Sequence, residues 1–358
     1  MKAAIIGLPK TGKTTIFNAL TRSEQSTDKY ATPAREANIG VVQVADERID
    51  KLAELYQPKK TIYATIEFHD YPGIFYKDSE TSETAMLADI KNAEAFILVL
   101  RCFSDEELEG LFPLGTPLEQ FQRFQEEMLL YDMIMAEKRL EKIELGYKRG
   151  VKTPAVQIEE KALHKIVDCL QNNQPLTAIT LNSEEEKAVR GFQFFSAKPM
   201  LILLNCNEDN LNTWDETLKS FTNKGYQAQI IAGKFEEELS KLDNEEALMF
   251  MADIGISESI CDRLAHWTYQ LMGYLSFFTV GPDEVRAWTI EKGANAVTAA
   301  GKIHSDLARG FIRAECFQYA DIITYGSEKA LKEKGLFRLE GKDYIVKDGD
   351  ILSIRFNV

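Results

Sequence analysis

The sequence contains few cysteines, and they lie far apart. Five occur among 358 residues, their number is odd, and no two of them form a C-x-x-C pair. They are Cys102, Cys169, Cys206, Cys261 and Cys316. This pattern excludes a disulfide framework and a zinc site built on paired cysteines. We therefore expect free thiols in a reducing compartment.

A long apolar run is also missing. No stretch approaches the ~20 residues that span a bilayer, and the apolar run at residues 1–8 is too short for a signal peptide. The sequence therefore predicts a cytoplasmic protein that does not enter a membrane. It shows no internal repeat and no low-complexity segment.

The chain has no surplus of basic charge. It carries 42 Lys and Arg against 56 Asp and Glu, a formal net charge of -14. This balance excludes a protein that wraps nucleic acid over most of its surface. Residues 276–358 hold 12 charges of each sign, so the whole acidic surplus lies upstream. Contact with a polyanion is therefore expected mainly from the C-terminal part.

Short apolar segments alternate with helical patterns in much of the chain. The apolar segments, which we interpret as buried strands, are residues 2–7, 64–68, 95–100, 200–204 and 229–232. Such runs are typical of a parallel sheet covered by helices on both faces. The predicted fold class is therefore α/β, and 358 residues predict two or three domains.

The character of the sequence changes twice along the chain. Residues 118–196 are charged and helix-forming, which predicts an inserted helical hairpin. The charged residues of this hairpin either form a solvated face over an apolar seam between the helices, or the hairpin is an arm that binds a partner. It divides the α/β domain into residues 1–117 and 197–275, and residues 276–358 form a third, β-rich module.

The β-rich module shows short strands, turns and one helix near residues 296–303. Residues 344–346 and 351–356 have the composition of strands. Asp348 and Gly349 lie between them and predict a hairpin turn.

Residues 7–14 have the pattern G-x-x-x-x-G-K-T, after an apolar strand and at the start of a helix. Gly7 and Gly12 let the loop curl and point backbone N–H groups at phosphates. Lys13 is the cation that reaches the β- and γ-phosphates, and Thr14 supplies a hydroxyl to Mg²⁺. The sequence thus predicts a site for ATP or GTP with Mg²⁺. The other predicted contacts in this loop are Lys10, Thr11 and Thr15.

The segment Asp-Tyr-Pro-Gly at residues 70–73 has the form D-x-x-G and follows a predicted strand. In P-loop proteins the carboxylate at this place holds Mg²⁺ through water, and the glycine N–H senses the γ-phosphate. A plain turn is the alternative. The position after the phosphate-binding loop favours a metal role for Asp70 and a catalytic role for both Asp70 and Gly73.

The segment Asn-Cys-Asn-Glu at residues 205–208 follows another predicted strand, where nucleotidases carry the base-reading N-K-x-D. An aspartate at the last position accepts two hydrogen bonds from guanine. Glu208 is one methylene longer and displaces the base if it takes the same position, so we expect guanine selectivity to be weak or lost. An asparagine-rich loop is the alternative for Asn205 and Glu208. Gly233, after the strand at 229–232, completes the predicted nucleotide site.

These motifs, in this order, resemble the YchF or Obg-like ATPase family over nearly the whole chain. The most specific matches are residues 284–290, 300–306, 310–315 and 340–350. The resemblance implies a P-loop NTPase domain with a helical arm, followed by a TGS domain of ubiquitin-like β-grasp fold. It also implies a preference for ATP, and binding to ribosomes or other RNA through the TGS domain and the arm.

The resemblance carries further expectations for the site. Ile74 stands where Ras-like switches place a water-orienting Gln, so hydrolysis should be slow. Lys10 stands where relatives place an Asn that helps to coordinate K⁺, and its ammonium either takes the ion's place or points into solvent. The spacing around Thr32 is longer than in the family, which leaves open whether Thr32 senses the γ-phosphate and Mg²⁺. His69 is interpreted as a core histidine, with a catalytic base as the alternative.

Two functions follow from the sequence. The first is an enzyme used as a switch, in which ATP or GTP with Mg²⁺ orders the loops around Thr32 and Gly73 and hydrolysis releases them. The second is a nucleotide-binding adaptor with incidental or no hydrolysis, which works through the arm and the TGS domain. A metabolic kinase needs a second pocket with acid–base residues, and the sequence offers no candidate cluster.

Overall fold

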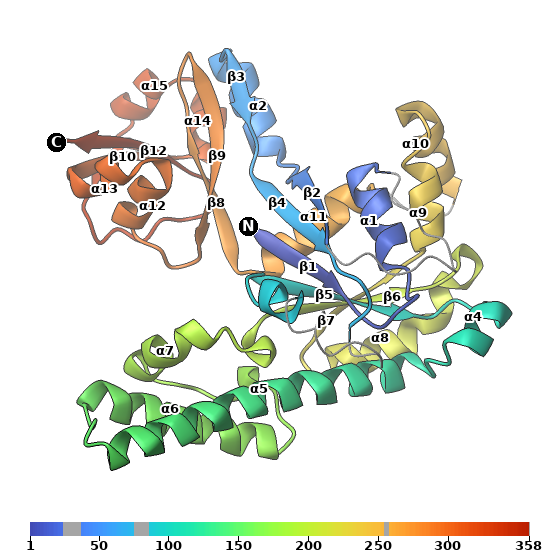
Figure 1. Ribbon diagram of the computed structural model, residues 1–358. Helices are drawn as coiled ribbons and strands as arrows, with labels where there is room; N and C mark the ends of the chain where they lie inside the picture. Colours follow the sequence, from blue (N-terminus) through green and yellow to red (C-terminus); the bar gives the residue numbers. More distant parts are fainter. Residues whose placement is uncertain (24–36, 75–85, 254–257, 358) are drawn as a thin grey trace. The chain divides into compact units, whose positions relative to one another are not determined.

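The computed structural model describes residues 1–23, 37–74, 86–253 and 258–357. The chain forms two compact units, and each of them is made of two chain segments (Figure 1). The first unit comprises Met1–Gly40 and Phe68–Phe250, and the second comprises Val41–Glu67 and Met251–Val358. No helix of the described segments is both long and apolar enough to cross a membrane.

A six-stranded sheet with the order β2-β4-β1-β5-β6-β7 underlies the first unit. Its strands are β1 (Lys2–Ile6), β2 (Asn38–Gln43), β4 (Thr65–Asp70), β5 (Ala95–Arg101), β6 (Met200–Asn205) and β7 (Gln227–Ile231). The pairs β1–β5, β5–β6 and β6–β7 are parallel. Every residue of β5 and β6 is buried, which explains their continuous apolar sequence. The α/β class with a parallel sheet is thus confirmed.

Helices cover both faces of this sheet (Figure 1). On one face α1 contacts α9, since Ile16 of α1 lies against Gly233 at the start of α9. On the other face, Phe124 of α5 and Phe221 of α8 belong to the same core as Phe96 and Ile202 of the strands. The helices outside the arm are α1 (Lys13–Thr21), α4 (Glu106–Leu111), α8 (Asp215–Thr222), α9 (Gly233–Leu239) and α10 (Asn244–Asp253).

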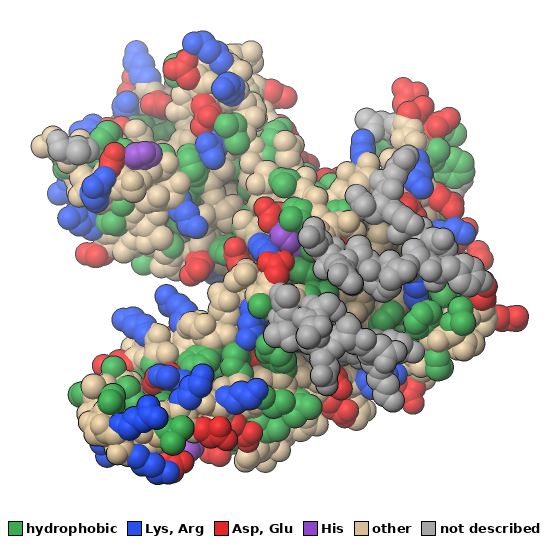
Figure 2. Space-filling view, in the orientation of Figure 1, with side chains coloured by type: hydrophobic (Ala, Val, Ile, Leu, Met, Phe, Trp, Pro, Cys, Tyr) green, Lys and Arg blue, Asp and Glu red, His purple; other side chains and the backbone are tan. Residues whose placement is uncertain are grey.

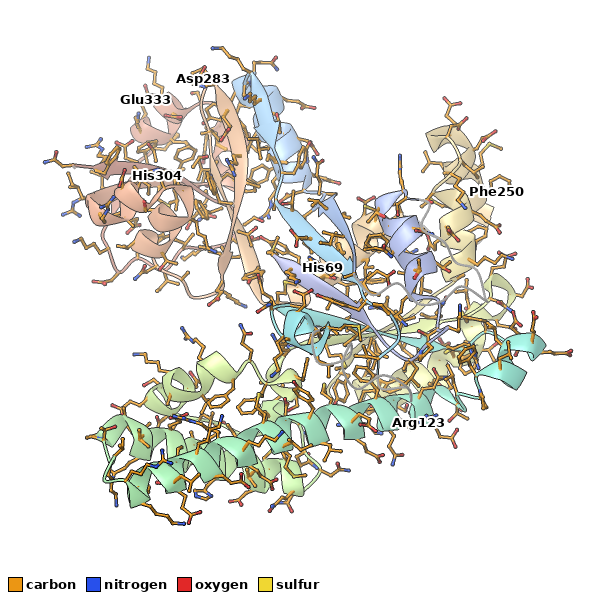
Figure 3. The ribbon with its side chains drawn as sticks, in the orientation of Figure 1. His69, Arg123, Phe250, Asp283, His304 and Glu333 are labelled. Carbon is orange, nitrogen blue, oxygen red and sulfur yellow. The ribbon has the colours of Figure 1, made fainter. Side chains whose placement is uncertain are left out.

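The predicted helical hairpin is confirmed and forms a long arm. It consists of α5 (Pro117–Lys148), α6 (Pro154–Gln171), α7 (Ser183–Val189) and three short 3-10 turns, η1 (Leu176–Ala178), η2 (Arg190–Phe192) and η3 (Phe195–Ala197). A capping box of Thr116 and Glu119 starts α5. Lys and Arg side chains gather over the end of the arm (Figure 2), and Arg123, near the start of α5, points away from the sheet (Figure 3).

The buried carboxylate of Asp132 fixes the arm to the body of the first unit. It accepts hydrogen bonds from the backbone N–H groups of Phe195 and Ser196, at 2.9 and 2.8 Å, and from the Ser196 hydroxyl at 2.7 Å. Asp132 lies on α5, and the two partners lie just before β6. These bonds therefore hold the return of the chain from the arm against α5.

A second six-stranded sheet has the order β11-β10-β12-β8-β9-β3. Its strands are β3 (Lys60–Ile62), β8 (Tyr274–Thr279), β9 (Glu284–Glu291), β10 (Phe311–Gln318), β11 (Arg338–Glu340) and β12 (Asp350–Phe356). The strands β8 and β9 form an antiparallel hairpin, and β12 pairs in parallel with β8. The predicted helix α12 (Ala296–Ile303) buries its alanines against Phe277 and Ile290. This is the β-grasp arrangement that was expected.

The remaining helices of the second unit lie around this sheet. They are α2 (Glu47–Tyr56), α11 (Ile260–Leu271), α13 (Ser305–Arg309), α14 (Tyr319–Tyr325) and α15 (Glu328–Glu333).

The predicted hairpin at Asp348 and Gly349 is wrong. The two residues do form a turn, but residues 344–346 are not a strand and make only one isolated bridge, between Ile345 and Asn295. Their backbone is used at the start of α12, where Val346 N–H donates to Ala294 O. β12 pairs instead with β10 and β8.

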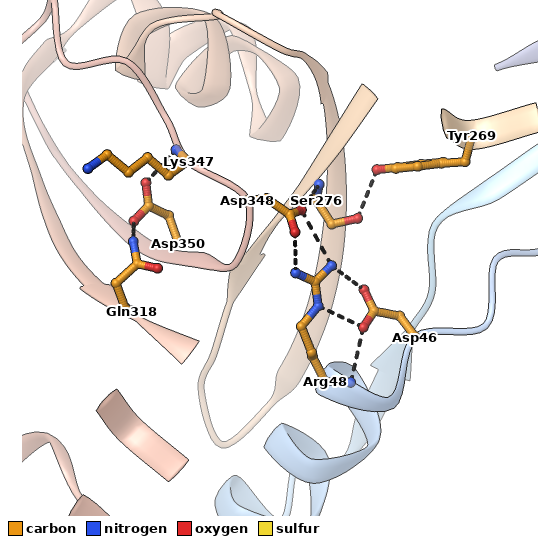
Figure 4. Close-up of polar contacts among 8 residues, drawn as sticks. All are labelled: Asp46, Arg48, Tyr269, Ser276, Gln318, Lys347, Asp348 and Asp350. Carbon is orange, nitrogen blue, oxygen red and sulfur yellow. Dashed lines mark hydrogen bonds and ion pairs between the residues drawn. The ribbon is translucent and has the colours of Figure 1, made fainter. Parts of the chain in front are cut away.

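Residues 41–67 join the second unit, which the predicted range 1–117 does not anticipate. β3 pairs in parallel with β9 along Lys60–Ile62. Arg48, on the first turn of α2, donates to Asp46 at 2.8 Å and to Asp348 at 2.6 Å (Figure 4). Asp348 also accepts the Ser276 N–H at 3.0 Å. The pairing of β3 with β9 and the contact of Arg48 with Asp348 have no local sequence signal, because these partners lie more than half the chain apart.

Candidate active site

The loop of residues 7–12 joins β1 to α1, as the G-x-x-x-x-G-K-T pattern predicts. Lys13 is the first residue of α1, and its side chain is buried. Its ammonium donates to the carbonyl oxygens of Leu8, at 2.8 Å, and Gly7, at 3.3 Å. The ammonium therefore lies inside the curl of the loop, where a phosphate group needs a cation.

Asn205, at the end of β6, braces this loop. Its Nδ2 donates to the Thr11 carbonyl at 2.9 Å, and its Oδ1 accepts the Gly233 N–H at 2.9 Å. Gly12 has a φ of 90°, and a Cβ there would lie 2.1 Å from Asn205 Nδ2, so this position requires glycine. The sequence pointed to Asn205 as a base contact, and the structure adds this bracing role. Glu208 is exposed at the start of the 3-10 helix η4 (Glu208–Trp214).

Thr14 and Asp70 meet at the predicted metal position. The Thr14 hydroxyl donates to Asp70 Oδ2 at 2.8 Å, and Asn38 Nδ2 donates to the same oxygen at 3.1 Å. Burial holds the pKa of Asp70 above its usual value, although the Lys13 charge and the hydrogen bonds from Thr14 and Asn38 act in the opposite direction. The carboxylate thus lies in a polar cradle formed by three segments of the chain.

The second oxygen of the Asp70 carboxylate, Oδ1, is suited to Mg²⁺. Asp70 Oδ1 is buried and accepts no hydrogen bond from the described residues. A carboxylate oxygen beside a hydroxyl is a donor set of hard oxygen atoms, which Mg²⁺ prefers. Among the described residues, no group of three His, Cys, Asp or Glu side chains could hold a metal.

Gly73 lies directly against the phosphate-binding loop. A Cβ at Gly73 would come within 2.6 Å of Pro9 atoms, so only glycine allows this approach. The next residue, Ile74, donates its N–H to the Gly7 carbonyl at 3.2 Å. The Ile74 side chain is 2% exposed and belongs to the hydrophobic core of the first unit. The D-x-x-G segment is therefore packed on the loop, with an apolar side chain where a polar one would orient water.

The two loop lysines lie in an unusual electrostatic setting. The pKa of Lys13 is lowered to about 8, mainly because the side chain is buried. The Asp70 carboxylate opposes this shift, and the charge of Lys10 adds to it. Lys10 has a φ of 58°, the left-handed region that non-glycine residues rarely adopt. An anionic group bound in this loop would stabilise both charges.

The other predicted residues are placed as follows. Thr15 is half-buried on the first turn of α1. Thr32 lies outside the described residues, as does most of the segment after Ile74. His69 lies on β4 (Figure 3). It is buried and stacks on Tyr71 with ring centroids 6.0 Å apart, consistent with a core histidine.

Two residues at the site were missed by the sequence analysis, namely Asn38 and Pro9. Asn38 contacts Asp70 although 32 residues separate them, and no local pattern signals the pair. Pro9 lies inside the G-x-x-x-x-G-K-T pattern at an unspecified position. The pattern therefore did not predict that Pro9 lies against Gly73.

A parallel sheet whose first strand runs through a curled loop into a helix, with a lysine in the curl and a Thr–Asp pair beside it, defines the P-loop nucleoside triphosphatases. Comparisons with known proteins support this class. Residues 2–138 match the family model described as "50S ribosome-binding GTPase", and residues 274–357 match the YchF-GTPase_C model, described as "Protein of unknown function (DUF933)".

Full-length relatives narrow the class further. The protein named "Ribosome-binding ATPase YchF" from Bacillus subtilis (strain 168) is 36% identical over 367 residues, which cover 100% of both chains. The protein of the same name from Escherichia coli O157:H7 is 36% identical over 362 residues, 100% of this chain and 99% of the relative. The YchF GTPase structure from Schizosaccharomyces pombe matches with a TM-score of 0.83 and 28% identity, covering 99% of this chain and 97% of that one. The chain belongs to the YchF family.

Proposed function

We propose that the chain is a nucleotide-dependent switch that binds ATP, slowly hydrolyses it with Mg²⁺, and acts on ribosomes. GTP is the alternative substrate. One observation carries the proposal: the phosphate-binding loop and the D-x-x-G segment are in contact, through Pro9 and Gly73, while the Ile74 side chain is withdrawn into the core. The site is thus built to bind and sense a triphosphate but lacks a side chain at position 74 that orients water.

The proposed roles of the residues follow from their positions. Lys13 exchanges its bonds to the loop carbonyls for bonds to the β- and γ-phosphates, and the loop N–H groups around Gly12 bind the phosphate oxygens. Thr14 and Asp70 would hold Mg²⁺, which supplies positive charge to the phosphate oxygens when bound. The Gly73 N–H is positioned to respond to the γ-phosphate.

The rate expectation rests on Ile74. Orientation of the attacking water contributes strongly to hydrolysis in related switches. An isoleucine can neither donate nor accept a hydrogen bond, so intrinsic turnover should be slow. A partner then completes the site, and hydrolysis thereby becomes coupled to a binding event.

The ribosome is proposed as the partner because both full-length relatives described above are named ribosome-binding ATPases. The β-grasp domain and the helical arm are the proposed contact elements. A cytoplasmic location follows from this proposal.

Single-turnover hydrolysis of ATP and GTP, with and without purified ribosomes, tests the function. We expect slow turnover that ribosomes accelerate, and ATP affinity at least equal to GTP affinity. Binding to ribosomes without any acceleration would favour the adaptor. Failure to bind either nucleotide would overturn the proposal.

A further inference from the structure

The far end of the arm carries a local basic surface. We define the arm tip as residues 145–152, the last turn of α5 and the link to α6. It contains Lys148, Arg149 and Lys152, and no acidic residue occurs anywhere in residues 145–158. In a chain with a net charge of -14 this is a marked local excess. We infer that the arm tip binds phosphate groups of ribosomal RNA, an inference that rests on the proposed function.

The arm holds this tip away from the body of the first unit. α5 has 32 residues, so it is about 48 Å long at 1.5 Å per residue. Near its start, Gln120 accepts the Arg101 N–H at 2.8 Å and donates to the Arg101 carbonyl at 2.8 Å. Arg101 lies at the end of β5 and is in register with Asn205, the brace of the phosphate-binding loop. The tip is thus at the end of a helix that begins close to the nucleotide site.

The helix dipole does not account for all of this charge. Cations near the end of a helix interact favourably with its carbonyl groups, which explains Lys148, the last residue of α5, and Arg149, its C-cap. Lys152 has no such explanation, because it precedes Thr153, the N-cap of α6, where the dipole disfavours a cation. The first turn of α6 contains no acidic residue, unlike those of α5 and α7.

Internal ion pairs do not neutralise the tip either. Lys148 pairs with Glu144 at 2.9 Å, but both side chains are more than 65% exposed, so the pair is weak. Within the described residues, Arg149 has no carboxylate at ion-pair distance, and Lys152 lies over the Tyr147 ring, 5.3 Å from its centroid. Tyr147 is itself fixed by a 2.7 Å hydrogen bond to Glu160. The cations are therefore available to an external anion on an ordered support.

Apolar side chains accompany the cations. Leu145 is 51% exposed and Val151 is 55% exposed. Folded RNA presents phosphates and unstacked base faces together in its loops. The cations of the arm tip can contact the phosphates, and its exposed apolar side chains can contact the base faces. An acidic protein surface is the competing partner, and the salt dependence of binding separates the two.

The test is ribosome sedimentation of the full chain over a series of KCl concentrations. The variant replaces the three cations, Lys148→Gln, Arg149→Gln and Lys152→Gln. The matched control removes three exposed cations of the same unit, Arg123→Gln, Lys219→Gln and Lys224→Gln. Each phosphate contact contributes about 0.7–0.9 to the slope of log K against log salt. The tip variant should therefore lose about 2–3 in slope, also with purified ribosomal RNA, while the control keeps the wild-type slope.

Several results would decide against the inference. An unchanged slope and affinity in the tip variant would overturn it while leaving the proposed function intact. Weaker ribosome binding without weaker binding to purified RNA would assign the tip to a protein surface. A wild type that binds no ribosomes would overturn the proposed function together with the inference. Basal ATP hydrolysis should be equal in all three proteins, and the charge-keeping variant Lys148→Arg, Arg149→Lys, Lys152→Arg should restore most of the slope.

Discussion

The hydroxyl of Thr14 donates a 2.8 Å hydrogen bond to the carboxylate of Asp70, 56 residues further along the chain. This bond joins the start of α1 to the end of β4. It places the two proposed Mg²⁺ ligands in contact and leaves the second carboxylate oxygen, Oδ1, without a hydrogen bond from the described residues.

The first prediction concerns this pair. Asp70→Asn should reduce Mg²⁺-dependent hydrolysis about 100-fold or more, because one anionic ligand is lost from the site. Nucleotide binding in excess EDTA should change little. Mg²⁺ titrations of nucleotide affinity measure the effect, and a variant with the wild-type Mg²⁺ dependence would show that Asp70 does not hold the metal.

The second prediction concerns pH. The pKa of Lys13 is lowered to about 8 in the nucleotide-free protein, and a bound triphosphate should raise it by favouring the charged form. Triphosphate affinity should therefore be constant below about pH 8 and fall up to ten-fold per pH unit above it. Calorimetry at a series of pH values measures this fall.

Lys13→Ala serves as the control for the pH series. It should bind triphosphate weakly at every pH and stay folded, and an unchanged Kd would refute the role of the loop.

The contribution of Lys13 to folding stability depends on pH in the opposite direction from triphosphate affinity. The unfolded chain keeps the ordinary, higher pKa, so the contribution of Lys13 to stability rises as pH increases from about 8 towards 10.

The third prediction concerns base selectivity. Glu208→Asp should shift preference towards GTP, because the shorter carboxylate reaches the guanine edge without displacing the base. The neighbouring exchange Asp209→Glu is a matched control and should leave the ratio unchanged. Competition between ATP and GTP measures the ratio. A wild type that binds GTP ten-fold more tightly, a gap of about 1.4 kcal/mol, would contradict the expectation.

The fourth prediction concerns Lys10. We expect wild-type hydrolysis to be insensitive to K⁺, because the Lys10 ammonium takes the place of the ion near the phosphates. Lys10→Asn should lower the rate in NaCl and recover part of it in KCl. The variant should also be more stable by about 1 kcal/mol, since asparagine tolerates the left-handed backbone better than lysine. Strong K⁺ stimulation of the wild type would show that Lys10 points into solvent.

The fifth prediction concerns the root of the arm. Asp132→Ala should lower the free energy of unfolding by about 3 kcal/mol, because three buried donors at Phe195 and Ser196 lose their acceptor. Denaturant unfolding measures the loss, and Asp132→Asn, which keeps one acceptor oxygen, should cost less. Equal stability of the alanine variant and the wild type would mean that the return from the arm is held by apolar packing alone.

Local patterns predicted those parts of the molecule whose residues are close in sequence. The run β1, loop and α1 followed from one apolar strand, two glycines and helical spacing, because each of these acts within a few residues. The buried strands β5 and β6 followed in the same way. Their continuous apolar sequence has few interpretations once helical segments flank it.

The parts that the sequence did not predict depend on tertiary contacts. Asn38 reaches Asp70, and Pro9 meets Gly73, only after the strands have assembled. Residues 344–346 have strand composition, but β12 takes its partners from β10 and β8. Pairing partners are set by the whole sheet and not by the strand itself.

The parallel pairing of β3 with β9 has a consequence for synthesis of the chain. About 220 residues separate the two partners, so β3 leaves the ribosome long before β9 exists. At about 5–20 residues per second, the nascent chain waits roughly 10 to 45 s with this strand unpaired. Both segments of the first unit, which ends at Phe250, are translated before β9, so the first unit can fold during that interval. The strands that are translated last therefore complete a sheet whose edge strand, β3, was translated first. A fragment of residues 276–358 alone would lack β3 and would expose the edge of β9 that β3 covers.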